Sequence, residues 1–110
     1  NVRRLRERVT HLLRAGEVTA AAKEACSLPY IEAKLRAGLA RDLVNEMLLC
    51  LPGLSAAGRS EEVGVVREMR LFVARLLPVL RAAPHRLYQL CSQEPDDEAA
   101  WKALQAYTGP

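Results

Sequence analysis

Apolar residues recur at helical spacing from the start of the chain. In residues 2–15 they fall three and four positions apart, the period that places side chains on one buried face of a helix. Gly16 follows directly, and glycine at that place is typical of a left-handed helix end. The pattern predicts a first helix whose inward side chains are Val2, Leu5, Val9, Leu12 and Leu13.

Three further helices are expected before the middle of the chain. An Ala-rich segment predicts a helix over 17–26 that Leu28-Pro29 ends, and a short helix follows over 30–37. Apolar residues then predict a helix over 39–51. We expect Pro52-Gly53 to end this helix, because proline inside a helix removes a hydrogen bond and clashes with the preceding turn.

Prolines divide the second half of the chain. Residues 52–60 are rich in Gly and Ser and are expected to form the one flexible loop. The longest predicted helix follows over 61–83, and Pro78 within it predicts a kink or a break. Pro84 and Pro95 each begin a shorter helix, since proline fits the first helical turn.

The composition restricts the fold to helices. The 110 residues include 18 Leu and 17 Ala but only one Phe, one Trp and three Tyr. Leu and Ala favour helices, and the residues that strands prefer are scarce. We therefore expect one all-α domain over residues 1–110, an irregular bundle of six or seven helices with solenoid-like packing as an open alternative. Because the sequence starts without Met inside a helical pattern, we interpret it as a fragment of a longer chain.

Charge and cysteine usage indicate an intracellular protein. The formal net charge is +3, and 13 of the 16 basic residues are Arg. Cys26, Cys50 and Cys91 stand far apart without a C-x-x-C pair, so reduced thiols in a cytoplasmic chain are the preferred interpretation. No apolar run approaches the roughly 20 residues that span a bilayer, so no membrane association is expected.

No residue pattern predicts an enzyme. The chain lacks both glycine-rich phosphate-binding motifs, and His11 and His85 have no Cys, Asp or Glu at metal-ligand spacing. The three cysteines lie in or beside apolar stretches, where a small buried side chain is the usual role. We expect no catalytic residues, no metal and no cofactor.

The first predicted helix is rich in arginine. Arg3, Arg6 and Arg14 project from the face roughly opposite Leu5 and Leu12. A solvated face is the simpler interpretation, and an acidic protein partner is the main alternative. Nucleic acid is not expected, because no aromatic residues alternate with the arginines to stack on bases.

Two blocks of sequence carry a resemblance. The first is Tyr30-Ile31-Glu32-Ala33-Lys34-Leu35-Arg36-Ala37-Gly38 with Asp42-Leu43 after it and Leu12-Leu13-x-Ala15-Gly16 before it. The second is Pro84-His85-x-Leu87-Tyr88-Gln89, followed by Glu94-Pro95-Asp96. Together they resemble the helical region between the nucleotide-binding module and the WD-repeat propeller of signal-transduction ATPases of the NACHT or NB-ARC type. The chain departs from the family at Asn45-Glu46-Met47, where an acidic-aromatic step is usual.

The resemblance implies a connector without activity of its own, which positions adjoining domains of the parent chain and contacts protein partners. Tyr30, Leu87 and Tyr88 lie in the matching blocks and are the apolar interaction candidates. We expect exposed apolar surface on the two short helices that contain them, because neighbouring domains would cover it. The alternative is a homotypic adaptor of the death-fold kind, whose length and helix number also fit.

Overall fold

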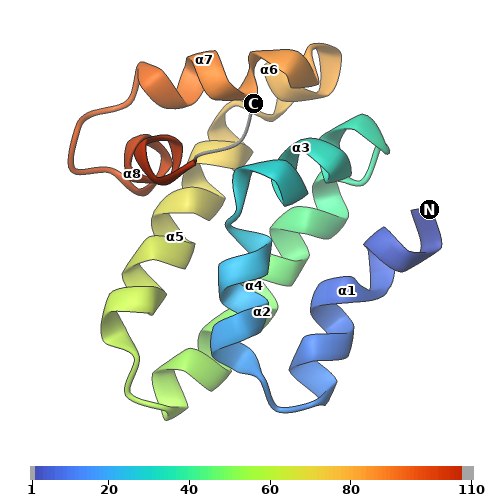
Figure 1. The fold of residues 1–110 in the computed structure, drawn as a ribbon, viewed down its shortest axis with the longest axis vertical. Coiled ribbons are helices and arrows are strands. Elements are labelled where there is room, and N and C mark those ends of the chain that lie inside the picture. Colours follow the sequence, from blue (N-terminus) through green and yellow to red (C-terminus); the bar gives the residue numbers. More distant parts are fainter. Residues whose placement is uncertain (1, 108–110) are drawn as a thin grey trace.

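The computed structural model describes residues 2–107, and within them it contains α-helices, one 3-10 turn and no strand (Figure 1). The all-α prediction is therefore confirmed. The elements in chain order are α1 (Val2–Arg14), α2 (Val18–Ala25), α3 (Leu28–Arg36), α4 (Ala40–Ala56), α5 (Ser60–Arg75), α6 (Leu77–Ala82), the 3-10 turn η1 (Pro84–Arg86), α7 (Leu87–Ser92) and α8 (Ala99–Ala106).

Four helices run up and down through the molecule. Figure 1 shows α1, α2, α4 and α5 alternating in direction, with α6 and α7 lying across one end and α8 beside α5. The tightest helix pair is α4 with α5, and α2 packs against both α1 and α4. One cluster of buried apolar side chains joins all these elements, from Val9 of α1 to Ala100 of α8. The result is an irregular bundle, 34 × 33 × 25 Å across.

The predicted loop over 52–60 is wrong. Helix α4 continues through Pro52 to Ala56, and only residues 57–59 connect it to α5. Leu54 explains this result, because its side chain is fully buried in the core and only the continued helix delivers it there. Burial of one leucine and its neighbours thus outweighs a local cost of about 3 kcal/mol for a proline inside a helix. Gly58, whose φ of 72° is left-handed, follows the helix end at Ala56 and turns the chain toward α5.

The break predicted near Pro78 is confirmed. The helix expected over 61–83 is divided at Leu76 into α5 and α6. Pro78 lies in the first turn of α6, where its missing N–H costs nothing. The new direction of α6 carries the chain across the end of the bundle (Figure 1).

Other predicted helix boundaries also differ from those observed. Pro84 begins the 3-10 turn η1, and the helix predicted from it, α7, starts only at Leu87. Leu28 and Pro29 begin α3 rather than end α2, because the Ser27 hydroxyl caps the new helix by accepting the Tyr30 N–H at 3.4 Å. The last helix begins at Ala99 rather than at Pro95. The Ala99 N–H donates to a Glu68 carboxylate oxygen at 2.9 Å, so α5 supplies the cap of α8.

Candidate interaction surfaces

An apolar groove lies between α2, α5 and α8 and includes the start of α3. It encloses about 620 Å³. Lys23 and Glu62 contribute one charge of each sign, and the other lining side chains are mainly small or apolar. We call this surface the apolar groove; its lining residues are Thr19, Ala22, Lys23, Cys26, Ser27, Leu28, Pro29, Glu62, Val65, Val66, Ala103, Ala106 and Tyr107.

Two side chains of the apolar groove, Val65 and Cys26, show that its surface is apolar and partly open to solvent. Val65 is 42% exposed, although valine is normally buried in a domain of this size. The half-buried Cys26 thiol has a pKa raised to about 12, because burial disfavours the thiolate and the nearby Cys50 adds to the effect. A thiol with such a pKa is a weak nucleophile at neutral pH.

A second depression follows α1 on its arginine side. It encloses about 510 Å³ and combines basic residues of α1 with one carboxylate from α2. Arg8 Nη1 lies 3.2 Å from Glu24 Oε2 within it. We call this surface the basic groove; its lining residues are Arg4, Glu7, Arg8, His11, Leu12, Arg14 and Glu24.

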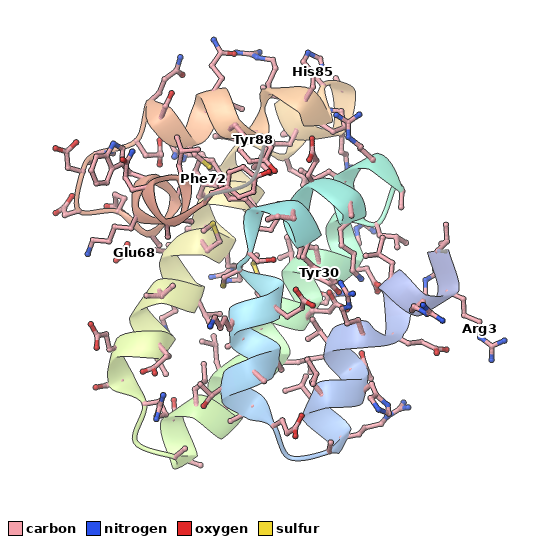
Figure 2. The ribbon with its side chains drawn as sticks, in the orientation of Figure 1. Arg3, Tyr30, Glu68, Phe72, His85 and Tyr88 are labelled. Carbon is pink, nitrogen blue, oxygen red and sulfur yellow. The ribbon has the colours of Figure 1, made fainter. Side chains whose placement is uncertain are left out.

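The three arginines singled out from the sequence are exposed, but they do not form one cluster. Arg14 lines the basic groove, while Arg3 forms an exposed ion pair with Glu7 at 3.7 Å. Arg6 lies on the other flank of α1, and Arg3 projects at the edge of the molecule in Figure 2. Within residues 2–107, no ion pair involves Arg6 or Arg14. Arg4 and Arg8 belong to the same arginine-rich helix but were not among the three candidates, and they line the basic groove together with Arg14.

A buried polar cluster joins α3 to α4. The Lys34 side chain has no exposed surface, and its Nζ lies 3.0 Å from Glu46 Oε2 and 2.9 Å from Asp42 Oδ2. The Tyr30 hydroxyl donates to Glu46 Oε1 at 2.8 Å, and Lys34 Nζ lies 5.5 Å from the centre of the Tyr30 ring. Burial raises the pKa of Tyr30 above its ordinary value, and the Glu46 carboxylate adds to the rise, so the phenol keeps the proton that it donates. This arrangement fixes α3 against α4.

Tyr30 and Leu87 offer a partner almost no surface. Tyr30 is 2% exposed and Leu87 is fully buried in the common core, so each holds helices of this domain together. Tyr88 is half-buried. Its hydroxyl donates to Glu32 Oε1 at 3.3 Å, and its ring lies 5.2 Å from that of Tyr107. Tyr88 therefore ties α7 to α3 and to the end of α8 (Figure 2).

The exposed apolar residues lie on other helices than predicted. The short segments around Tyr30 and Tyr88 were expected to expose apolar surface, and this expectation is wrong. The large hydrophobic residues with the most exposure are on α1, α4 and α5, because the short helices turn their apolar faces into the end of the bundle. These exposed residues are Val2, Leu48, Leu49, Val65 and Leu71.

The described residues contain no group of three or more His, Cys, Asp or Glu side chains placed to hold a metal ion. His11 and His85 are both exposed, on α1 and on η1. Cys50 and Cys91 are fully buried. Within residues 2–107, no helix is both long and apolar enough to cross a membrane.

Comparison with known proteins adds no relative: the chain matches no protein-family model, no curated protein and no solved structure. The two grooves and the exposed leucines are therefore the features of the molecule that bear on its function.

Proposed function

We propose that this chain is a non-catalytic helical connector domain of a multidomain signalling NTPase, and that a helix of an adjoining domain packs into its apolar groove. The observation that carries the proposal is the apolar groove itself, which is open to solvent, is lined mainly by α2, α5 and α8 and by the start of α3, and contains the 42% exposed Val65. The sequence resemblance to the helical region of such ATPases supports the same interpretation.

The shape and chemistry of the groove fit a helix better than a polar ligand. Ala22 on α2 and Ala103 and Ala106 on α8 line its walls, and such small side chains allow the axis of a fourth helix to approach within about 8–10 Å. The surface that a fourth helix would cover is mainly apolar, so its burial supplies the driving force. Lys23 and Glu62 give the groove charges of opposite sign, which would orient the occupant.

A thiol placed in the groove tests this proposal. With the native Cys26 replaced by Ser, Val65→Cys is labelled with a maleimide in the isolated chain and in a longer chain that contains the adjoining domains. Leu71→Cys is the matched control, because it lies on the same helix, is 57% exposed and does not line the groove. In the longer chain, we expect the rate of labelling of Val65→Cys to fall by about tenfold or more relative to that of Leu71→Cys. This is the rate expected if the adjoining helix leaves the groove only about a tenth of the time.

Equal relative rates in the two chains would show that no adjoining domain covers the groove, and the connector proposal would fail. A small apolar molecule that protects Val65→Cys in the isolated chain would instead assign the groove to a ligand.

A further inference from the structure

Helix α1 concentrates the positive charge of the whole chain. Its 13 residues hold five arginines against the single Glu7, a net charge of +4. The complete chain has a net charge of +3, so all other residues together sum to −1. The apolar side of α1 packs on the core through Leu5, Val9 and Leu12, and the arginines therefore lie on its outward side.

The basic groove arranges part of this charge for contact with a partner. Arg4, Arg8 and His11 follow one another at four- and three-residue spacing, which places them on one side of the helix. Arg14 lines the same groove one turn further along, and the half-buried Leu12 supplies an apolar patch beside them. Cationic groups spaced by single helical turns match carboxylates that are spaced by helical turns or along an extended strand.

One carboxylate of this chain already occupies the groove. Glu24 of α2 reaches across to pair with Arg8 at 3.2 Å, and its other oxygen accepts the Ser27 hydroxyl at 3.4 Å. The guanidinium groups of the groove are therefore positioned to bind a carboxylate. Glu24 pairs with Arg8, and Arg14 has no ion pair within residues 2–107.

We propose that the basic groove of α1 binds an acidic segment of a partner protein, whose carboxylates pair with Arg4, Arg8 and Arg14 and compete with Glu24. This goes beyond the connector proposal, which concerns the apolar groove on a different set of helices. A polypeptide fits better than a nucleic acid, because Glu7 and Glu24 interrupt the positive surface. A nucleic-acid strand carries a phosphate about every 3.4 Å and could not avoid them.

Two further observations specify the partner. None of the described side chains that line the groove is Phe, Tyr or Trp, so the larger aromatic rings on which bases stack are lacking there. A second copy of this chain is a poor occupant. Its own acidic segment over 94–98 is partly used internally, since Glu94 pairs with Arg75.

The test measures binding of a fluorescein-labelled oligoglutamate peptide to the full 110-residue chain by fluorescence anisotropy, at about 0.15 M salt, where the Debye length is about 8 Å. The triple variant Arg4→Gln/Arg8→Gln/Arg14→Gln removes the basic groove and keeps helix-favouring side chains. Its matched control is Arg41→Gln/Arg67→Gln/Arg81→Gln, which removes the same charge from three other exposed positions. We expect the first variant to bind about tenfold more weakly or worse, and the control to change less than about threefold, because only contacts at close range survive screening.

A gain of affinity provides a second readout, which a folding defect could not produce. Glu24→Gln removes the carboxylate that competes for Arg8 and should tighten binding of the peptide by about threefold, the effect of one modest ion pair. Absence of peptide binding, equal losses in the two triple variants, or weaker binding by Glu24→Gln would each overturn the proposal. Tighter binding of an oligothymidine than of the peptide would assign the groove to nucleic acid and overturn it as well.

Discussion

Lys34 and Glu46 form an ion pair with a separation of 3.0 Å between Nζ and Oε2, although the two residues are 0% and 3% exposed. Taking two charges out of water is costly, and the cost is offset here because both groups have further partners. Asp42 accepts a second hydrogen bond from Lys34, and Tyr30 donates to Glu46. Removal of one member should therefore leave a charge without compensation.

Lys34→Met is expected to lower the free energy of unfolding by about 3 kcal/mol or more, because it leaves the Glu46 carboxylate buried without its cation. Arg36→Met is the matched control on the same helix, since its ion pair with Glu32 is exposed and is worth about 0.5 kcal/mol. Urea unfolding of both variants gives the comparison. Adding Glu46→Leu to Lys34→Met should recover part of the loss, and equal stability of Lys34→Met and Arg36→Met would contradict the role of the cluster.

Two glycines within helices, Gly53 of α4 and Gly64 of α5, test how closely α4 packs against Val18 of α2. A Cβ added at Gly53 would lie 2.8 Å from Cγ2 of Val18, whose branched side chain has little freedom to move, whereas a Cβ at Gly64 would meet nothing within 4 Å. Gly64→Ala should therefore stabilise the chain by about 0.5–1 kcal/mol, the helix preference of alanine over glycine. Gly53→Ala should destabilise it by about 1–3 kcal/mol, as overpacking does. Thermal unfolding of the two variants should shift in opposite directions, and a shift upward for both would contradict the close contact with Val18.

The same region shows the limit of local sequence signals. Apolar periodicity predicted α1 and the burial of Val9, but Val2, which was also predicted to face inward, is 56% exposed at the start of the helix. The rigid ring of Pro78 was sufficient to predict the break between α5 and α6. Pro52-Gly53 gave the strongest local stop signal in the chain, and burial of Leu54 overrode it. The preference of one or two residues for a turn is a local property. Burial depends on contacts between distant segments of the chain, and local sequence patterns carry no information about those contacts.

The candidate surfaces were less predictable than the helices. Lys34 stands between Ile31 and Leu35 on an inward helix face, and Glu46 stands three residues after Leu43, so each burial had a signal in the helical period. Their pairing had no such signal, because it depends on how α3 crosses α4. The apolar groove depends in the same way on where α8 lies against α2 and α5, and no single segment encodes it.

Tyr88 is expected to contribute to stability through its ring more than through its hydroxyl. Tyr88→Phe keeps the ring contact with Tyr107 and loses only the bond to Glu32, so it should cost about 1 kcal/mol or less. Tyr88→Ala should cost about 2 kcal/mol, less than a fully buried aromatic, because the side chain is half-buried. The exposed His85→Ala serves as the control in the same urea experiments. A loss of less than about 0.5 kcal/mol in Tyr88→Ala, within the range of a surface substitution, would show that Tyr88 is free to serve an adjoining domain.

Glu98 should titrate above the ordinary value of 4.5 for a glutamate. A hydrogen bond with Glu68 and the charge of that carboxylate raise the pKa of Glu98. A raised pKa in the folded state contributes stability below the unfolded value, and this contribution is lost as the pH rises through the folded value. NMR titration should place the pKa of Glu98 above 4.5 in the parent sequence and lower in Glu68→Gln than in the parent. Glu61→Gln, on the same helix, should leave it unchanged, and a pKa that does not respond to Glu68→Gln would contradict the shared hydrogen bond.

The isolated chain should sediment as a monomer at physiological salt. A connector domain makes its contacts with adjoining domains, whereas a death-fold adaptor polymerises through charged faces. The charge distribution makes the two outcomes separable, because α1 is basic and residues 94–98, at the opposite side of the molecule in Figure 1, are acidic. Head-to-tail association of these faces would weaken as salt rises, since the Debye length falls from about 30 Å at 0.01 M to about 8 Å at 0.15 M. Association through the exposed Leu48 and Leu49 of α4 would instead persist in salt, because apolar burial is not screened.

Sedimentation velocity at both salt concentrations, on the parent sequence and on Arg4→Gln/Arg8→Gln/Arg14→Gln, distinguishes these cases. Polymers that dissolve in salt and disappear in the triple variant would favour the adaptor over the connector.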